Sequence, residues 1–137
     1  MAQYLLDTDI CIELFRHNEQ VIKKIEAVGR TNCFVSEITI AELFYGAAKS
    51  GREENYVDVQ RIQTLFEVIP LRPSFRLYGI NKASLQAKGM SVGEFDLLIG
   101  SCAVYNNLVM VTSNLKHFSP IPDIMLEDWA KKSKYTK

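Results

Sequence analysis

The sequence has few of the residues that cross-link a protein or bind soft metals. Its 137 residues include three cysteines, Cys11, Cys33 and Cys102, an odd number with no CxxC or Cys/His spacing. This argues against a disulfide scaffold and against a cysteine metal site. We expect the three thiols to be small buried side chains in a reducing compartment.

Long apolar runs and a surplus of charge are also missing. No run approaches the ~20 residues that a membrane span needs, and the N-terminus has no basic segment followed by an apolar one. We therefore expect a cytoplasmic protein. The formal net charge is zero, which argues against a non-specific nucleic-acid coat because such proteins are normally basic. A nuclease stays open, since acids clustered at a metal site can balance basic residues elsewhere.

The composition fits one globular domain. Apolar residues make up 47% of the chain and charged residues 23%, as in ordinary soluble domains of this length. We see no repeat, low-complexity segment or linker. We expect a domain over residues 1–130 and a basic C-terminal tail over 131–137, which we interpret as a solvated end rather than an RNA contact.

Short apolar segments alternate with helical patterns along the chain. This alternation predicts a three-layer α/β fold, with a short, mostly parallel sheet of about five strands flanked by helices on both faces. Capping residues and glycines mark most of the helix ends. The predicted strands are 4–6, 33–35, 68–69, 108–111 and 124–126, and the predicted helices are 9–16, 18–29, 36–51, 53–66, 74–88 and a nearly all-apolar helix capped by Ser91.

Carboxylates and an amide stand at positions where such a sheet places its sites, just past the carboxyl ends of the strands. Asp7 follows the first strand, although it is also a candidate helix cap, and Asn114 follows the fourth. Asp96 lies in the first turns of the all-apolar helix, where a buried carboxylate needs a partner. Glu42 lies well inside the helix that Ser36 begins, so capping does not explain it. We predict that these residues share one site.

Four neighbouring residues are secondary candidates. Asp9 is interpreted as a helix N-cap rather than a metal ligand. Glu94 is interpreted as the partner of Ser91 in a capping box. Thr8 is also available as a helix cap, and Thr112 is a weaker candidate for orienting a carboxylate or a water molecule.

Oxygen ligands without histidine or cysteine favour Mg²⁺ or Mn²⁺. Such an ion supports phosphodiester hydrolysis, because it polarises the phosphoryl group and lowers the pKa of a bound water. His17 and His117 are not needed for this chemistry, and we expect both at the surface.

Five stretches in order carry a family resemblance. The chain strongly resembles the PIN-domain family and, within it, the VapC-type toxins of bacterial toxin–antitoxin pairs. The resemblance implies a metal-dependent endoribonuclease that pairs with a VapB-type antitoxin, forms a homodimer and larger toxin–antitoxin assemblies, and cuts RNA, with initiator tRNA in its anticodon stem-loop as the expected substrate. The matching stretches are residues 4–12, 36–46, 93–100, 111–118 and 126–129.

The resemblance assigns the acidic positions to Asp7, Glu42 and Asp96, and a fourth position to Asn114. Asp7 and Asp96 are expected to bind the ion, Glu42 to complete its shell or orient the attacking water, and Asn114 to position a water or a second ion. The first motif usually reads Asp-Thr-Asn, but here its third residue is Asp9. Because Asn114 is neutral, we predict one firmly held ion, with a second recruited, if at all, alongside the substrate.

Two alternatives remain at this point. Asp7 and Asp9 also match the spacing of a haloacid-dehalogenase-type phosphatase, although no lysine stands after a strand in the right region. A non-catalytic, partner-binding PIN-like domain is the second alternative. The RNA target is not fixed by the sequence, and the candidate basic contacts are Lys49, Arg52, Arg72 and Lys116.

Overall fold

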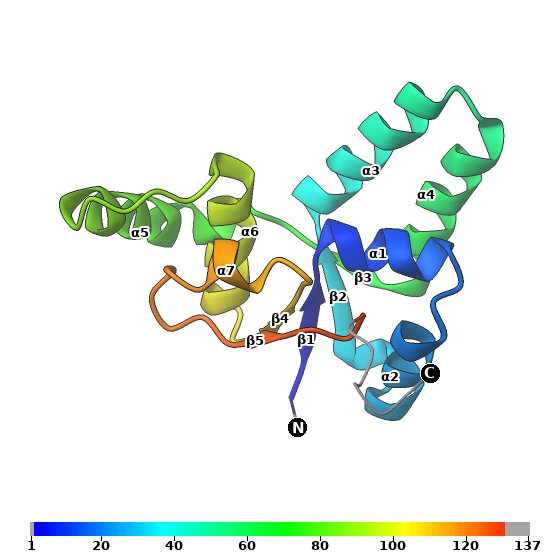
Figure 1. Ribbon diagram of the computed structural model, residues 1–137, viewed down its shortest axis with the longest axis horizontal. Coiled ribbons are helices and arrows are strands. Elements are labelled where there is room, and N and C mark those ends of the chain that lie inside the picture. Colours follow the sequence, from blue (N-terminus) through cyan, green and yellow to red (C-terminus); the bar gives the residue numbers. More distant parts are fainter. Residues whose placement is uncertain (1, 131–137) are drawn as a thin grey trace.

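A parallel five-stranded sheet forms the centre of the molecule (Figure 1). The computed structural model describes residues 2–130. The strands lie in the order β3-β2-β1-β4-β5, and every neighbouring pair is parallel. The predicted fold class is confirmed. The strands are β1 (Tyr4–Leu6), β2 (Cys33–Ser36), β3 (Glu67–Ile69), β4 (Val109–Val111) and β5 (Leu126–Glu127).

Helices cover both faces of this sheet. In Figure 1, α1 to α4 lie on the right of the sheet and α5 to α7 on the left. The helices are α1 (Thr8–Phe15), α2 (Glu19–Val28), α3 (Glu37–Ser50), α4 (Glu53–Leu65), α5 (Phe75–Ala87), α6 (Glu94–Tyr105) and α7 (Leu115–Phe118), with short 3₁₀ turns η1 (Arg30–Asn32) and η2 (Arg72–Ser74).

Alternating side chains of the strands build two cores. Leu6 and Val111 pack with the helices α1 to α4, whereas their neighbours Leu5 and Met110 pack with α5 and α6. All four are completely buried, and burying a side chain of this size contributes about 1.5–3 kcal/mol. Both faces of the central strands are therefore apolar. This explains why the sequences of these strands are continuous runs of hydrophobic residues.

Most predicted helix ends are confirmed. The side chains of Asn18 and Ser36 accept backbone hydrogen bonds at the starts of α2 and α3. Gly29 and Gly51 follow those helices with positive φ angles of 92° and 69°, a backbone region that favours glycine.

Three predicted boundaries are wrong. Asp7, not Asp9, is the N-cap of α1, because α1 begins at Thr8. The last strand is Leu126–Glu127 rather than 124–126. Ser91 does not cap α6, which begins at Glu94 after Gly93 and has no side-chain cap hydrogen bond.

The three cysteines are free and buried, as predicted. Burial raises the pKa of the Cys33 and Cys102 thiols to about 11, which leaves both protonated at neutral pH. The predicted tail 131–137 lies outside the described residues. Within residues 2–130, no helix combines the length and apolarity that crossing a membrane requires.

The order of the strands creates a switch point. The chain moves outward from β1 through β2 to β3 on one side, and from β4 to β5 on the other. The connection that follows β1 and the connection that follows β4 therefore run to opposite sides of the sheet. Open parallel sheets bind ligands in the crevice that this leaves past the carboxyl ends of the two strands.

Candidate metal centre at the switch point

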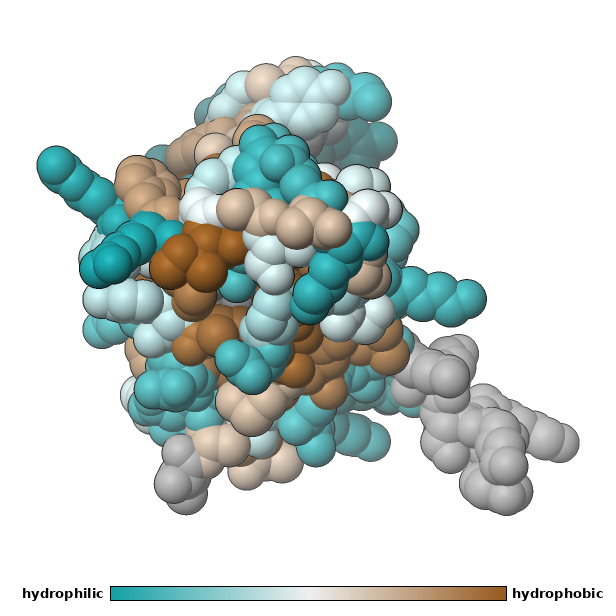
Figure 2. Space-filling view, turned by 90° about the vertical axis from the view of Figure 1, so that its left-hand side faces the viewer, coloured by the Kyte–Doolittle hydropathy of each residue, from teal (hydrophilic) through white to brown (hydrophobic). Residues whose placement is uncertain are grey.

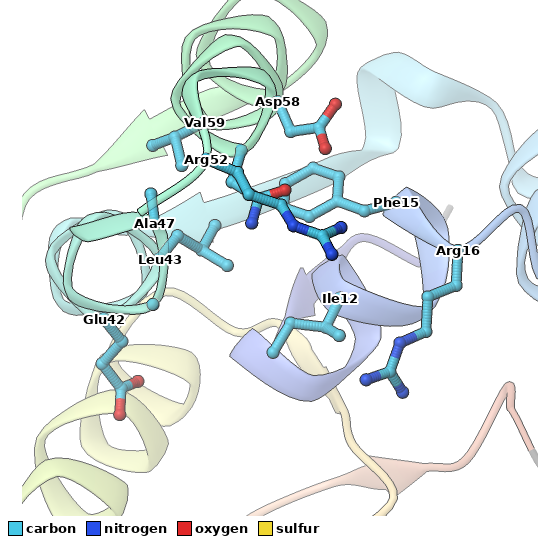
Figure 3. Close-up of a pocket in the computed structure, with 11 residues that line it drawn as sticks. Ile12, Phe15, Arg16, Glu42, Leu43, Ala47, Arg52, Asp58 and Val59 are labelled. Carbon is cyan, nitrogen blue, oxygen red and sulfur yellow. The ribbon is translucent and has the colours of Figure 1, made fainter. Parts of the chain in front are cut away.

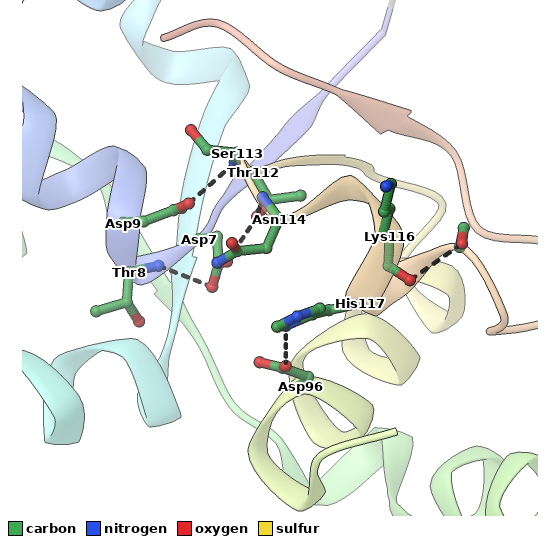
Figure 4. Close-up of polar contacts among 10 residues, drawn as sticks. Asp7, Thr8, Asp9, Asp96, Thr112, Ser113, Asn114, Lys116 and His117 are labelled. Carbon is green, nitrogen blue, oxygen red and sulfur yellow. Dashed lines mark hydrogen bonds and ion pairs between the residues drawn. The ribbon is translucent and has the colours of Figure 1, made fainter. Parts of the chain in front are cut away.

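Asp7 occupies the switch point. Its amide donates to the carbonyl of Val111 at 2.9 Å, which continues the pairing of β1 with β4. Its carboxylate accepts hydrogen bonds from the Thr8 amide and the Thr112 hydroxyl, each at 2.8 Å. The side chain thus caps α1 and also faces the crevice (Figure 4), so the cap is confirmed and the metal-binding role of Asp7 stays a prediction.

The surroundings of Asp7 disfavour its negative charge. Burial, followed by the charge of Asp9, raises its pKa to about 7, and Asp96 adds to this effect. The hydrogen bonds from Thr112 and Thr8 act in the opposite direction. A cation bound beside Asp7 would favour the ionised carboxylate.

Asp9 links the start of α1 to the loop after β4. Its Oδ2 accepts a hydrogen bond from the Ser113 amide at 2.9 Å, as Figure 4 shows. Its Oδ1 is buried and has no hydrogen-bond partner in the described part of the chain. Burial raises the pKa of Asp9, and the hydrogen bond from the Ser113 amide opposes this shift. Asp9 therefore adds uncompensated negative charge next to Asp7.

Glu42 reaches the centre from α3. Its Oε1 accepts a hydrogen bond from the Thr8 hydroxyl at 2.6 Å, a short distance typical of a hydroxyl donating to a charged acceptor. In Figure 3 its carboxylate points away from the apolar side chains of Leu43 and Ala47. Glu42 is thereby tied to the residue that directly follows Asp7.

Buried hydroxyl groups support this contact in a chain. A threonine hydroxyl has one hydrogen, and the Thr8 hydrogen goes to Glu42. In the hydrogen bond of 3.1 Å between the Thr8 and Thr39 hydroxyls, Thr39 must then be the donor and Thr8 the acceptor. Ser36 donates in turn to Thr39 at 3.4 Å. Thr39 and Ser36 are completely buried, so the position of Glu42 is fixed from inside the molecule.

Asp96 stands at the start of α6, across the crevice from Asp7. Its side chain is 33% exposed, and its Oδ2 lies 3.7 Å from Nδ1 of His117 (Figure 4). The prediction of a buried Asp96 is wrong, because the buried face of α6 runs through Leu97 and Ile99 instead. Partial burial nevertheless raises the pKa of Asp96, and His117 opposes the shift.

Asn114 and Glu94 differ in their relation to the centre. Asn114 is exposed. Its backbone amide donates to the Thr112 hydroxyl at 3.0 Å, and the same hydroxyl donates to Asp7. Glu94 forms no capping box and instead pairs with Lys82 of α5 at 3.1 Å. We therefore retain Asn114 as a member of the site, whereas Glu94 joins α6 to α5.

These donors fit a hard divalent cation whose shell is shared with water. Within residues 2–130, no three carboxylate, histidine or cysteine side chains meet closely enough to hold an ion alone. Nor does any lysine or arginine of that range form an ion pair with Asp7, Glu42 or Asp96. Oxygen ligands, the unpartnered Oδ1 of Asp9 and uncompensated charge suit Mg²⁺ or Mn²⁺, since Mg²⁺ keeps several waters and takes one or two protein carboxylates.

The Thr8 hydroxyl provides a first test of this centre. Thr8→Val removes the donor to Glu42, and we expect it to weaken Mg²⁺ or Mn²⁺ binding by about 10-fold, as for other groups that orient ligands. Thr8→Ser keeps the hydroxyl and should restore binding. Calorimetric metal titration measures both variants, and wild-type affinity in Thr8→Val would contradict the role.

Comparison with known proteins identifies the fold family. The PIN-domain family model matches residues 4–122. The chain belongs to the PIN-domain family. The match includes Asp7, Glu42, Asp96 and Asn114, and it gives no support to the dehalogenase-type phosphatase.

Curated PIN-domain relatives match over nearly their whole length. Ribonuclease VapC2 of Rickettsia felis is 35% identical over 132 residues, which cover 93% of this chain and 98% of that protein. The tRNA(fMet)-specific endonuclease VapC of Salmonella typhimurium is 34% identical over 131 residues, covering 94% and 99%. The chain therefore lies within the VapC ribonucleases of the PIN-domain family, which favours an enzyme over a non-catalytic domain.

Solved PIN-domain structures agree with the fold. DNA-bound VapBC of Salmonella typhimurium superposes with a TM-score of 0.87 at 34% identity, covering 94% of this chain and 99% of that one. VapBC2 of Rickettsia felis, bound to a promoter DNA fragment, gives 0.83 at 34% identity, covering 92% and 98%.

Proposed function

We propose that this chain is the toxin of a type II toxin–antitoxin pair and that it hydrolyses RNA phosphodiester bonds with Mg²⁺ or Mn²⁺. The observation that carries this proposal is the acidic surroundings of Asp7. It senses the charge of Asp96 and is joined through Thr8 to Glu42, and no lysine or arginine within residues 2–130 forms an ion pair with any of the three. The relatives named as ribonucleases supply the reaction class.

Each side chain has a separate task in this proposal. Asp7 and Asp96 hold the ion, directly or through water, and Glu42 completes the shell or orients the attacking water. Asn114 is linked to Asp7 through the Thr112 hydroxyl, and its neutral side-chain amide positions a water or a phosphate oxygen. When bound, the ion polarises the phosphoryl group and lowers the pKa of a nearby water. One firmly held ion suffices for these tasks.

Initiator tRNA is the substrate that we propose, because a relative with 34% identity is named for it. Lys49, Arg52, Arg72 and Lys116 are all exposed and are available to contact its phosphates. With Mg²⁺ or Mn²⁺ present, we expect the purified protein to cut initiator tRNA once in the anticodon stem-loop. Elongator methionine tRNA is the control. Cleavage that persists after chelation of the metal would contradict the mechanism, and equal cleavage of both tRNAs would contradict the substrate.

A groove beside Glu42 supports a protein partner. It lies between α1, α3 and α4, has a volume of about 490 Å³ and combines apolar side chains with Arg16, Arg52 and Asp58 (Figure 3). We propose that a VapB-type antitoxin places its C-terminal segment here and so blocks access to Glu42.

Exposed apolar side chains support assembly beyond a single pair. Phe75 and Ile80 of α5 are 51% and 55% exposed, and the side of the molecule on which α5 lies shows brown hydrophobic patches between hydrophilic side chains (Figure 2). Such patches mark interaction sites. We propose a homodimer that combines with antitoxin into a larger assembly.

A further inference from the structure

A second hollow adjoins the metal centre and has no task in the mechanism above. Its volume is about 390 Å³, within the range of small-ligand sites. Asp96 forms part of its wall, so the hollow is continuous with the place where the reacting phosphate would sit. The other lining residues are Ser91, Val92, Gly93, Lys116, His117 and Pro120.

The walls of this hollow combine a flat ring with apolar and hydroxyl groups. His117 has a side chain that is 67% exposed, and Figure 4 shows its ring next to the Asp96 carboxylate. Val92 and Pro120 add apolar surface, and Ser91 adds a hydroxyl. Lys116 also lines the hollow, but its amino group points away from Asp96 in Figure 4.

A nucleobase has the chemistry that this lining suits. Proteins recognise unpaired RNA bases by stacking them on aromatic or histidine rings and by hydrogen bonds to their edges. The hollow offers a ring in His117 and a hydrogen-bonding group in Ser91. Because Asp96 belongs both to the hollow and to the metal centre, a base in the hollow and a phosphate at the centre would come from adjoining nucleotides.

We propose that this hollow binds the unpaired nucleobase next to the scissile phosphodiester, with the His117 ring stacked on the base. The proposal rests on the ribonuclease function and adds a specificity subsite to it. It also predicts that an RNA is cut where a base can leave its stack, as in a loop.

Three variants test the subsite by RNA binding. All carry Asp7→Asn to prevent cleavage, and the probe is the anticodon stem-loop of initiator tRNA with 2-aminopurine at each loop position in turn. We expect His117→Ala to weaken binding about 10-fold, as for loss of one stacked base, and to remove the fluorescence quenching at one position next to the cut. His117→Phe should keep the wild-type RNA affinity and the fluorescence quenching at that position. Tyr105→Ala, at the far end of α6 and 50% exposed, is the matched control.

The outcomes separate the subsite from the ribonuclease function. If wild type cuts the RNA but His117→Ala binds it as tightly as Tyr105→Ala does, the subsite is wrong and the ribonuclease stands. If His117→Phe is as weak as His117→Ala, His117 acts through its contact with Asp96 and the stacking proposal is overturned. If wild type cuts no RNA, the proposed function fails and the subsite fails with it.

Discussion

Asp96→Asn is expected to lower the rate of RNA cleavage by at least about 100-fold, because it removes a charge that holds the ion. The fold should survive. The side chain of Asp96 is 33% exposed, and its Oδ2 lies 3.7 Å from Nδ1 of His117, so an amide of the same shape leaves no hole in the core. Cleavage rates and thermal unfolding of both proteins check the two parts of this prediction.

Glu94→Gln is the matched control for Asp96→Asn. It removes a carboxylate from the same turn of α6, but one that pairs with Lys82 at 3.1 Å. An exposed ion pair of this kind contributes about 0–1 kcal/mol, so stability and cleavage should stay close to wild type. If both variants lost cleavage activity equally, the activity would depend on the structure of this turn of α6 rather than on the Asp96 carboxylate.

Without metal, the protein should lose stability between about pH 4 and pH 7. The pKa of Asp7 is about 7 in the folded chain, against an ordinary value of 3.8. The folded state therefore holds the proton more tightly than the unfolded state, and this contribution is complete at low pH and disappears as the pH rises through 7. The loss amounts to a few kcal/mol, since one pKa unit corresponds to about 1.4 kcal/mol.

Metal should reverse this loss above pH 7, because the ionised Asp7 is the form that binds it. Asp7→Asn should depend less steeply on pH in this range, with the raised pKa values of Asp9 and Asp96 as the remaining contributions, and should gain no stability from Mg²⁺ or Mn²⁺. Asp9→Asn removes the neighbouring charge and should move the transition to lower pH, whereas Asp123→Asn, at an exposed position, should behave as wild type. Unfolding by urea at several pH values measures each variant. A wild type without this pH dependence would contradict the environment assigned to Asp7.

The sequence predicts the position of Asp7 for a reason that the structure confirms. Its place after a buried strand identifies the carboxyl end of a parallel sheet, and the order of the strands puts that end at the switch point. Asp96 is predicted for a reason that the structure contradicts. A nearly all-apolar helix indicates burial on all sides, but the first turn of α6 projects toward the crevice and leaves Asp96 partly exposed.

The remaining differences come from contacts that are distant in the sequence. Local patterns make Asp9 and Ser91 good helix caps, yet Asp9 instead binds the Ser113 amide at 2.9 Å, and α6 begins two residues after Val92. The roles of Thr39 and His117 depend on Thr8 and Asp96, which lie 31 and 21 residues away. Spacing rules for helices and strands do not predict contacts between residues so far apart in the sequence.

The most direct test of the central claim is to map new RNA 5′ ends in cells that express this chain without antitoxin. The wild type should arrest growth and produce discrete cuts in one or a few RNAs, with initiator tRNA cut in its anticodon stem-loop. Asp96→Asn, made at the same level, should produce neither. New 5′ ends of equal abundance in both, or none in the wild type, would contradict a ribonuclease built on Asp7, Glu42 and Asp96.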